Sequence, residues 1–247
     1  MIDNELVKAV TLTGSEHAGS IVAGQSGKLL KKTVLELGGS DPFIVLSDAD
    51  LEKAAQNAVK ARMINNGQSC IAAKRFIVEE SIAAEFEEKA KEIMASLQAG
   101  DPADEKTAVA PLARLDLLED LESQVERSLT KGAEILTGGR RIDKKGYFFE
   151  PTILTNVNPD MPVMTEETFG PVMPVIRVKD EEEAVHVANR NIYGLGGSIF
   201  TRDTEKGERI ARRIETGNMF INAFTKSDPR LPFGGVKKSG YGRELSH

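Results

Sequence analysis

Short apolar segments alternate with longer amphipathic segments along the whole chain, and this alternation limits the possible folds more than any other feature. The short segments are rich in β-branched and aromatic residues, as strands are, and charged residues or glycine separate them. The longer segments repeat apolar residues every three or four positions, which is typical of helices with one buried face. This order predicts an α/β fold with a twisted, mainly parallel sheet. The expected strands cover 10–12, 34–37, 43–46, 76–78, 172–178, 197–200 and 219–222, and the expected helices cover 50–66, 82–97, 112–129, 180–191 and 204–214.

Polar residues mark the ends of two expected helices. Asp48 is the expected N-cap of the helix over 50–66, because an aspartate side chain there can accept hydrogen bonds from the first free N–H groups. The run Gly100-Asp101-Pro102 is expected to stop the chain from continuing as a helix after 82–97.

Composition and charge exclude several classes of protein. The formal net charge of −6 argues against a nucleic-acid partner. No apolar run approaches the roughly 20 residues that a membrane-spanning helix needs, so we expect no membrane partner. The single cysteine allows no intramolecular disulfide, which fits a cytoplasmic protein. The three histidines, His17, His186 and His247, have no metal-ligand spacing, so no metal is expected.

The single cysteine, Cys70, follows an expected helix and a polar turn that contains Gly67. A lone cysteine can be a small buried apolar residue. At the start of a new helical segment, however, the peptide dipoles would favour its thiolate. Its backbone N–H would then point at an oxyanion formed on the carbon that the sulfur attacks. Cys70 is therefore a candidate nucleophile.

A carboxylate, Glu36, lies between two leucines at the end of an expected strand. It could be an edge-strand residue that points to water. If it faces a cleft instead, burial raises its pKa towards neutrality and allows it to act as a general base on water. The glycines Gly38 and Gly39 permit a turn or a close approach after it.

Two further segments could contact a nucleotide. Thr13-Gly14-Ser15 joins an expected strand to a helix rich in small residues, and such a junction can offer N–H groups and a hydroxyl to a phosphate. Taken alone, this pattern is common in βα turns. The run 166–171 is typical of a solvated loop, yet a glutamate in it could accept hydrogen bonds from ribose while Phe169 packs against a flat heterocycle.

The order and spacing of these segments resemble the aldehyde dehydrogenase superfamily over practically the whole chain. A thiol hydrolase of another class would need a histidine base, and none of the three histidines lies in an evident partner motif. The matching segments are Leu12-Thr13-Gly14-Ser15, Leu35-Glu36-Leu37-Gly38-Gly39, Gly67-Gln68-Ser69-Cys70, Glu167-Thr168-Phe169-Gly170-Pro171, Tyr193-Gly194-Leu195 and Pro232-Phe233-Gly234-Gly235-Val236-Lys237-Lys238-Ser239-Gly240.

The resemblance implies oxidation of an aldehyde with NAD or NADP as cofactor. Cys70 matches the thiol that adds to the aldehyde to give a thiohemiacetal, which loses hydride to the nicotinamide and leaves a thioester. Glu36 matches the base that activates water to release the carboxylic acid. The expected cofactor contacts are Thr13, Gly14, Ser15, Leu37, Glu167 and Phe169.

The segment 224–231 resembles that of succinate-semialdehyde dehydrogenases. Lys226 and Arg230 could attract the substrate carboxylate, and an arginine suits a bidentate contact. They could equally be ordinary solvated cations. The expected substrate is thus a small aldehyde, with succinate semialdehyde as the leading candidate.

The same resemblance implies that part of the family's chain is missing. We expect residues 1–38 to be a remnant of the NAD(P)-binding domain, 39–238 the catalytic domain, and 239–247 the start of a C-terminal tail. The family's second oxyanion donor, an asparagine, and its adenosine-ribose contacts have no counterpart here. The alternative to an active enzyme is therefore a truncated fragment that folds but binds cofactor poorly, with little or no activity. The full-length protein is expected to be a homo-oligomer.

Overall fold

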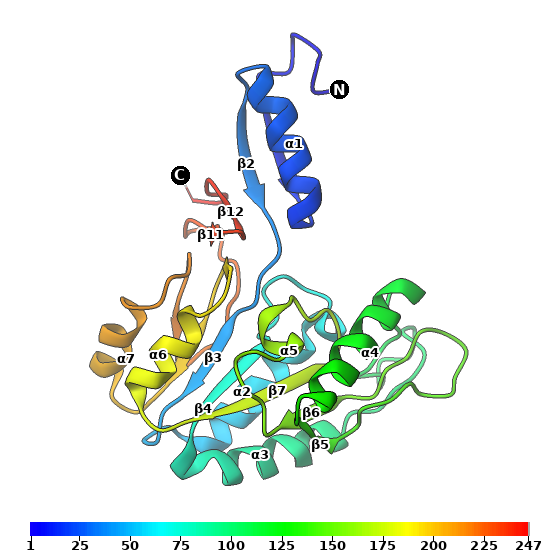
Figure 1. Ribbon diagram of the computed structural model, residues 1–247, viewed down its shortest axis with the longest axis vertical. Coiled ribbons are helices and arrows are strands. Elements are labelled where there is room, and N and C mark those ends of the chain that lie inside the picture. Colours follow the sequence, from blue (N-terminus) through cyan, green and yellow to red (C-terminus); the bar gives the residue numbers. More distant parts are fainter. Residues whose placement is uncertain (247) are drawn as a thin grey trace.

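The structure, a computed structural model, describes residues 1–246, and within them a seven-stranded sheet carries helices on both faces (Figure 1). Its strands are β3 (Pro42–Val45), β4 (Arg75–Glu79), β5 (Glu134–Thr137), β6 (Thr152–Thr155), β7 (Val172–Val178), β9 (Ser198–Phe200) and β10 (Phe220–Ile221). They lie in the order β10-β9-β3-β4-β7-β6-β5, and every neighbouring pair except β5 and β6 is parallel. The expected α/β fold with a mainly parallel sheet is confirmed.

A smaller sheet projects from the large one beside a single helix, at the top of Figure 1. Its members are β1 (Ala9–Thr13), β2 (Lys32–Glu36) and β12 (Gly240–Tyr241), and α1 (Glu16–Lys28) packs against β1 and β2. The central strand β2 runs parallel to β1 and antiparallel to β12. Since Glu36 ends β2 and β3 begins at Pro42, Glu36 lies where the two sheets meet. Nearby, β8 (Tyr193–Gly194) pairs antiparallel with β11 (Val236–Lys237).

Two apolar clusters bind the helices to the large sheet. Successive strand side chains point to opposite faces, so Phe43 and Val45 pack on one side while Ile44 and Leu46 pack on the other. The helices on the first side are α2 (Leu51–Met63) and α3 (Glu80–Ala95), and those on the second are α4 (Leu115–Thr130), α5 (Pro162–Thr165), α6 (Glu181–Asn189) and α7 (Thr204–Ala211).

The expected N-cap Asp48 is wrong. Helix α2 begins one residue after Asp50, whose carboxylate accepts a hydrogen bond from Lys53 N at 3.2 Å. The carboxylate of Asp48 lies away from the helix, where it accepts hydrogen bonds from Thr201 Oγ1 at 2.8 Å and from Arg202 N at 2.9 Å. Both aspartates can cap in principle, and the tertiary contact with the end of β9 decides which one does.

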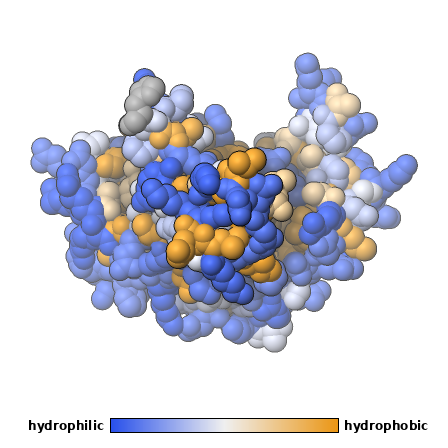
Figure 2. All heavy atoms as spheres, turned by 90° about the horizontal axis from the view of Figure 1, so that it is seen from above, coloured by the Kyte–Doolittle hydropathy of each residue, from blue (hydrophilic) through white to orange (hydrophobic). Residues whose placement is uncertain are grey.

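The projecting unit of β1, β2 and α1 leaves apolar side chains in solvent. In the view from above, hydrophobic residues interrupt the polar surface (Figure 2). The exposed fractions are 86% for Leu6, 57% for Ile21, 42% for Leu29 and 95% for Leu30. Within residues 1–246, no helix combines the length and the apolar character needed to cross a membrane.

Candidate functional site

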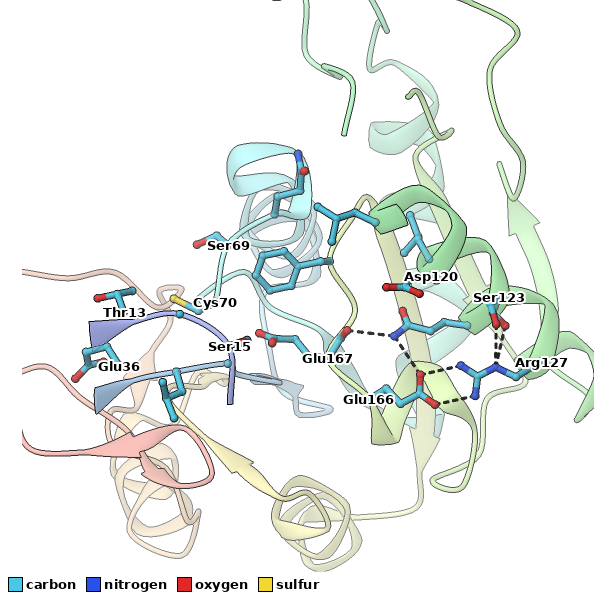
Figure 3. A pocket seen from close by; sticks show the side chains of 18 residues that line it. Thr13, Ser15, Glu36, Ser69, Cys70, Asp120, Ser123, Arg127, Glu166 and Glu167 are labelled. Atoms are coloured by element: carbon cyan, nitrogen blue, oxygen red, sulfur yellow. Dashed lines mark hydrogen bonds and ion pairs between the residues drawn. The ribbon is translucent and has the colours of Figure 1, made fainter. Parts of the chain in front are cut away.

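A cavity of about 780 Å³ lies where the small sheet meets the large one. In Figure 3, Cys70, Glu36 and Thr13 lie on one side of it, and Arg127 and Glu166 lie on the other. Helix α4 forms the opposite wall, to which sequence analysis assigned no functional residue. All eight residues proposed above for catalysis and cofactor contact line this cavity: Thr13, Gly14, Ser15, Glu36, Leu37, Cys70, Glu167 and Phe169.

Left-handed backbone conformations direct the chain from α2 to Cys70. After α2, Asn65 and Asn66 have φ of 48° and 57°, and Gly67 follows with φ of +77°. A Cβ at Gly67 would lie 2.1 Å from the carbonyl oxygen of Gly170, so only glycine fits. Cys70 itself lies in a turn, and no helix begins there. The expectation that it starts a helical segment is therefore wrong.

Because no helix begins at Cys70, no helix dipole favours its thiolate. Burial is the main cause that raises the pKa of the Cys70 thiol, and Asp41 and Glu167 raise it further. The ammonium of Lys74 and a hydrogen bond from the Ile71 backbone N–H lower this pKa, without reversing the net rise. The local support for the thiolate thus comes from Lys74 and one amide.

Glu36 is held in the small sheet from both sides. Its carbonyl oxygen accepts a hydrogen bond from Gly14 N at 3.0 Å, and it pairs with Gly240 of β12. The side chain is only 6% exposed, and its Oε1 has no hydrogen-bond partner among residues 1–246. Burial raises the pKa of Glu36 to about 7, the charge of Glu244 adds to this rise, and Arg243 opposes it. A carboxyl with this pKa can accept a proton near neutral pH.

The Thr13–Ser15 turn opens the N-terminus of α1 onto the cavity. Ser15 caps the helix by accepting a hydrogen bond from Ala18 N at 3.2 Å. The first acidic residue of α1, Glu16, forms an ion pair with Lys238 at 2.6 Å. The positive end of a 13-residue helix is a favourable place for a phosphate group.

Glu167 and Glu166 have different partners. Glu167 Oε1 accepts a hydrogen bond from Gly39 N at 2.7 Å. A Cβ at Gly38 would lie 2.3 Å from Glu167 Oε2, so glycine at this position makes room for the carboxylate. Glu166 forms two hydrogen bonds with Arg127, at 2.7 Å and 2.8 Å. Glu167 is therefore the carboxylate held against the β2–β3 connection, and Glu166 is paired with α4.

Lys226 and Arg230 lie outside the cavity. The guanidinium of Arg230 binds the Asp228 carboxylate at 2.9 Å and 2.7 Å, and its side chain is 85% exposed. Lys226 is also exposed. The structure does not bring either cation to Cys70, and their contact with a substrate carboxylate stays a prediction. In the described part of the chain, no group of histidine, cysteine or acidic residues could hold a metal ion; His247 lies outside that part.

A group of buried charges, which the sequence did not predict, lies behind the Cys70 turn. Asp41, Arg62, Lys74 and Arg75 are each at most 1% exposed. Lys74 donates hydrogen bonds to the carbonyl oxygens of the turn and lies 3.7 Å from Glu167. Lys74 and Arg75 stand directly before apolar strand residues, a pattern that is typical of an exposed strand end. The sequence therefore did not predict their burial.

Comparison with known proteins gives a consistent set of relatives. A model described as "Aldehyde dehydrogenase family" matches residues 1–247. The chain is 51% identical over 247 residues to the succinate semialdehyde dehydrogenase (NAD(P)+) Sad of Escherichia coli strain K12, covering 100% of this chain and 54% of that protein. It is 50% identical over 245 residues to a probable succinate-semialdehyde dehydrogenase (NADP(+)) of Synechocystis, with 99% and 54% covered. The chain thus spans about half the length of the curated relatives it matches.

Solved structures agree with these relatives. Succinic semialdehyde dehydrogenase from Streptococcus pyogenes, in complex with NADP+, superposes with a TM-score of 0.96 at 45% identity, over 99% of this chain and 54% of that one. Betaine aldehyde dehydrogenase from Staphylococcus aureus, in complex with NAD+, gives a TM-score of 0.95 at 35% identity, over 100% of this chain and 50% of that one.

Proposed function

Because the chain belongs to the aldehyde dehydrogenase family, we propose that its cavity takes part in the oxidation of an aldehyde to a carboxylic acid with NAD(P)+. One observation carries this proposal. The chain's single thiol and a carboxyl with a pKa of about 7 line the same cavity, beside the N-terminus of α1. The thiol can act as nucleophile and the carboxyl as base.

In the first step, the Cys70 thiol loses its proton to water, and the sulfur forms a bond to the aldehyde carbon. The carbonyl π electrons move to the oxygen, which becomes an oxyanion. The backbone N–H of Cys70 has no hydrogen-bond partner among the described residues, so it is free to donate to this oxygen. The resulting thiohemiacetal carbon is a better hydride donor than a free aldehyde.

Residues that line the cavity suit the pyrophosphate and the nicotinamide half of the dinucleotide that the family uses. When bound, NAD(P)+ supplies the acceptor for the hydride. The N–H groups at the start of α1 would hold the pyrophosphate, near Gly14 and Ser15. The carboxylate of Glu167 would accept hydrogen bonds from the nicotinamide ribose, and Phe169 and Leu37 would contact the ring.

In the last step, Glu36 accepts a proton from water while the water oxygen attacks the thioester carbon. The carbon–sulfur bond then breaks, so the carboxylic acid leaves and the sulfur of Cys70 is restored. This role is supported by the pKa of Glu36, about 7, and by its place in the lining of the cavity that Cys70 also lines.

Succinate semialdehyde is the proposed substrate, because the curated relatives of this chain are succinate-semialdehyde dehydrogenases. Lys226 and Arg230 remain proposed contacts for its carboxylate. The division into residues 1–38, 39–238 and 239–247, a cytoplasmic location and a homo-oligomeric full-length protein belong to the same proposal. The alternative to this proposal is that these 247 residues fold but bind the cofactor poorly.

An ester substrate tests the roles of Cys70 and Glu36 without the cofactor, because ester hydrolysis needs no hydride acceptor. With p-nitrophenyl acetate, the wild-type chain should acquire an acetyl group on Cys70, located by mass spectrometry, and then lose it. Cys70→Ala should acquire none, and Glu36→Gln should acquire it and retain it. Acetylation of Cys70→Ala at the wild-type rate would refute the assigned nucleophile. NAD(P)H formation from succinate semialdehyde, read by its absorbance, then distinguishes an active enzyme from a fragment that only hydrolyses esters.

A further inference from the structure

Lys74 is fully buried, and no step proposed above uses it. Its side chain has an exposed fraction of 0%. The ammonium Nζ donates to the carbonyl oxygens of Ser69 at 2.9 Å, Cys70 at 3.0 Å and Ala72 at 3.1 Å. A lysine ammonium has three N–H donors, and this turn receives all of them. Lys74 therefore gathers three carbonyl groups around one point on the buried side of the turn.

The planarity of the peptide bond gives this arrangement a consequence for Cys70. In a trans peptide, the C=O of one residue and the N–H of the next point in opposite directions. No peptide bond among the described residues is cis. With the Ser69 carbonyl drawn inward to Lys74, the N–H of Cys70 points outward. With the Cys70 carbonyl drawn inward, the N–H of Ile71 points outward, and it donates to the Cys70 sulfur.

The same ammonium also lies near two other residues that line the cavity. Lys74 Nζ lies 3.7 Å from Glu167 Oε1 and 5.5 Å from the centre of the Phe169 ring. Burial lowers the pKa of Lys74 to about 8, and the charge of Glu167 opposes this decrease, so the ammonium is still mostly protonated at pH 7. The charged groups that face Lys74 or the thiol are Asp41, Arg62 and Glu167.

We propose that Lys74 is a positioning residue, which holds the Ser69–Ala72 turn with its carbonyls inward so that the N–H groups of Cys70 and Ile71 face the reacting atoms. The Ile71 N–H stabilises the thiolate, and the Cys70 N–H stabilises the oxyanion of the attacked substrate. The second part rests on the proposed function, whereas the first concerns the thiol alone. The two parts can be measured separately.

The single cysteine makes both measurements specific, because every modified thiol is Cys70. Alkylation by iodoacetamide needs the thiolate but forms no oxyanion, so its rate at about pH 7, where Lys74 is mostly protonated, reports the fraction of thiolate. Acylation by p-nitrophenyl acetate needs both the thiolate and the oxyanion donor. The variants are Lys74→Met, which removes charge and donors, and Lys74→Gln, which keeps N–H donors without the charge. Lys53→Met, at an exposed position of α2, is the matched control.

We expect the alkylation rate at about pH 7 to fall in both Lys74 variants, because the ammonium and the ordered Ile71 N–H both favour the thiolate. At the same pH, acylation of Lys74→Met should fall about 10²-fold relative to its alkylation, as when one oxyanion donor is lost. Lys74→Gln should recover part of this ratio through its amide donors. Lys53→Met should match the wild type in both measurements.

An unchanged alkylation rate at about pH 7 in Lys74→Met and Lys74→Gln would overturn the inference, and so would an unchanged ratio of acylation to alkylation in Lys74→Met. If wild-type Cys70 is alkylated but never acylated, the proposed function fails, and the alkylation rate alone decides the role of Lys74. If Lys74→Met does not fold, as judged by circular dichroism, the alkylation rate of Lys74→Gln decides.

Discussion

Replacing Glu36 by glutamine should make the folded chain more stable at alkaline pH, even though it removes the proposed base. The carboxyl has an ordinary pKa of 4.5 and a folded pKa of about 7, chiefly because it is buried. Each pKa unit is worth about 1.4 kcal/mol, so ionised Glu36 costs the folded state about 3 kcal/mol. The unfolded chain ionises freely, and this cost is therefore absent below pH 4.5 and complete above about pH 7.

The assay is urea unfolding of the wild type and of Glu36→Gln at about pH 4.5 and about pH 8.5, two values on either side of the expected change. The glutamine amide does not ionise, so its own effect on the free energy of unfolding is the same at both pH values. The test is therefore how much the difference in free energy of unfolding between variant and wild type changes with pH. The advantage of the variant should grow by about 3 kcal/mol at the higher pH. Glu92→Gln, at an exposed glutamate of α3, should show no such growth. A stability difference that is equal at both pH values would refute burial as the cause of the raised pKa.

Three further outcomes follow from the site. The rate at which acyl-Cys70 is hydrolysed should rise with pH to a plateau, with a midpoint of about 7 set by Glu36, and Glu36→Gln should lose this dependence in stopped-flow measurements. Gly67→Ala should lower the free energy of unfolding by at least about 2 kcal/mol in urea titrations, because its Cβ would lie 2.1 Å from Gly170 O at a φ of +77°; equal stability would contradict this steric argument. Arg230→Met should leave thermal stability unchanged, since its ion pair is exposed, and should raise the KM of a full-length enzyme for succinate semialdehyde but not for a neutral aldehyde of equal length. Equal KM changes for the two aldehydes would remove Arg230 from the proposed substrate contacts.

The large sheet and its helices could be predicted because their signals are local. Period-two and helical spacings appear within single segments, so the strands β3, β4 and β7 and the helices α2, α3 and α4 lie within a few residues of the expected ranges. The strands β5 and β6 were missed, since four residues each, in a loop-rich region, carry too little pattern to recognise.

The site, too, has features that the sequence predicts and features that it does not. Cys70 and Glu36 stand out in the sequence because a lone thiol and an isolated carboxylate between leucines are unusual. The environment of Cys70 could not be predicted from the sequence, because the backbone after α2 turns through left-handed residues where a new helix was expected. The sequence does not indicate that Lys74 is buried, because a buried lysine differs from a solvated one only through the chain that folds around it. Tertiary structure decides burial, and burial here decides the pKa values.

The pairing of β12 with β2 has a consequence for when the site can assemble. Leu37 N donates to Ser239 O, and Ser239 Oγ donates to Gly38 O, so residues late in the sequence secure the strand that bears Glu36. A ribosome makes Glu36 about two hundred residues earlier than these partners, a separation that slows closure of the contact. The environment that raises the pKa of Glu36 includes Glu244, which is made later still. During synthesis the large sheet can therefore form first, and the carboxyl acquires its raised pKa only when residues 239–244 dock.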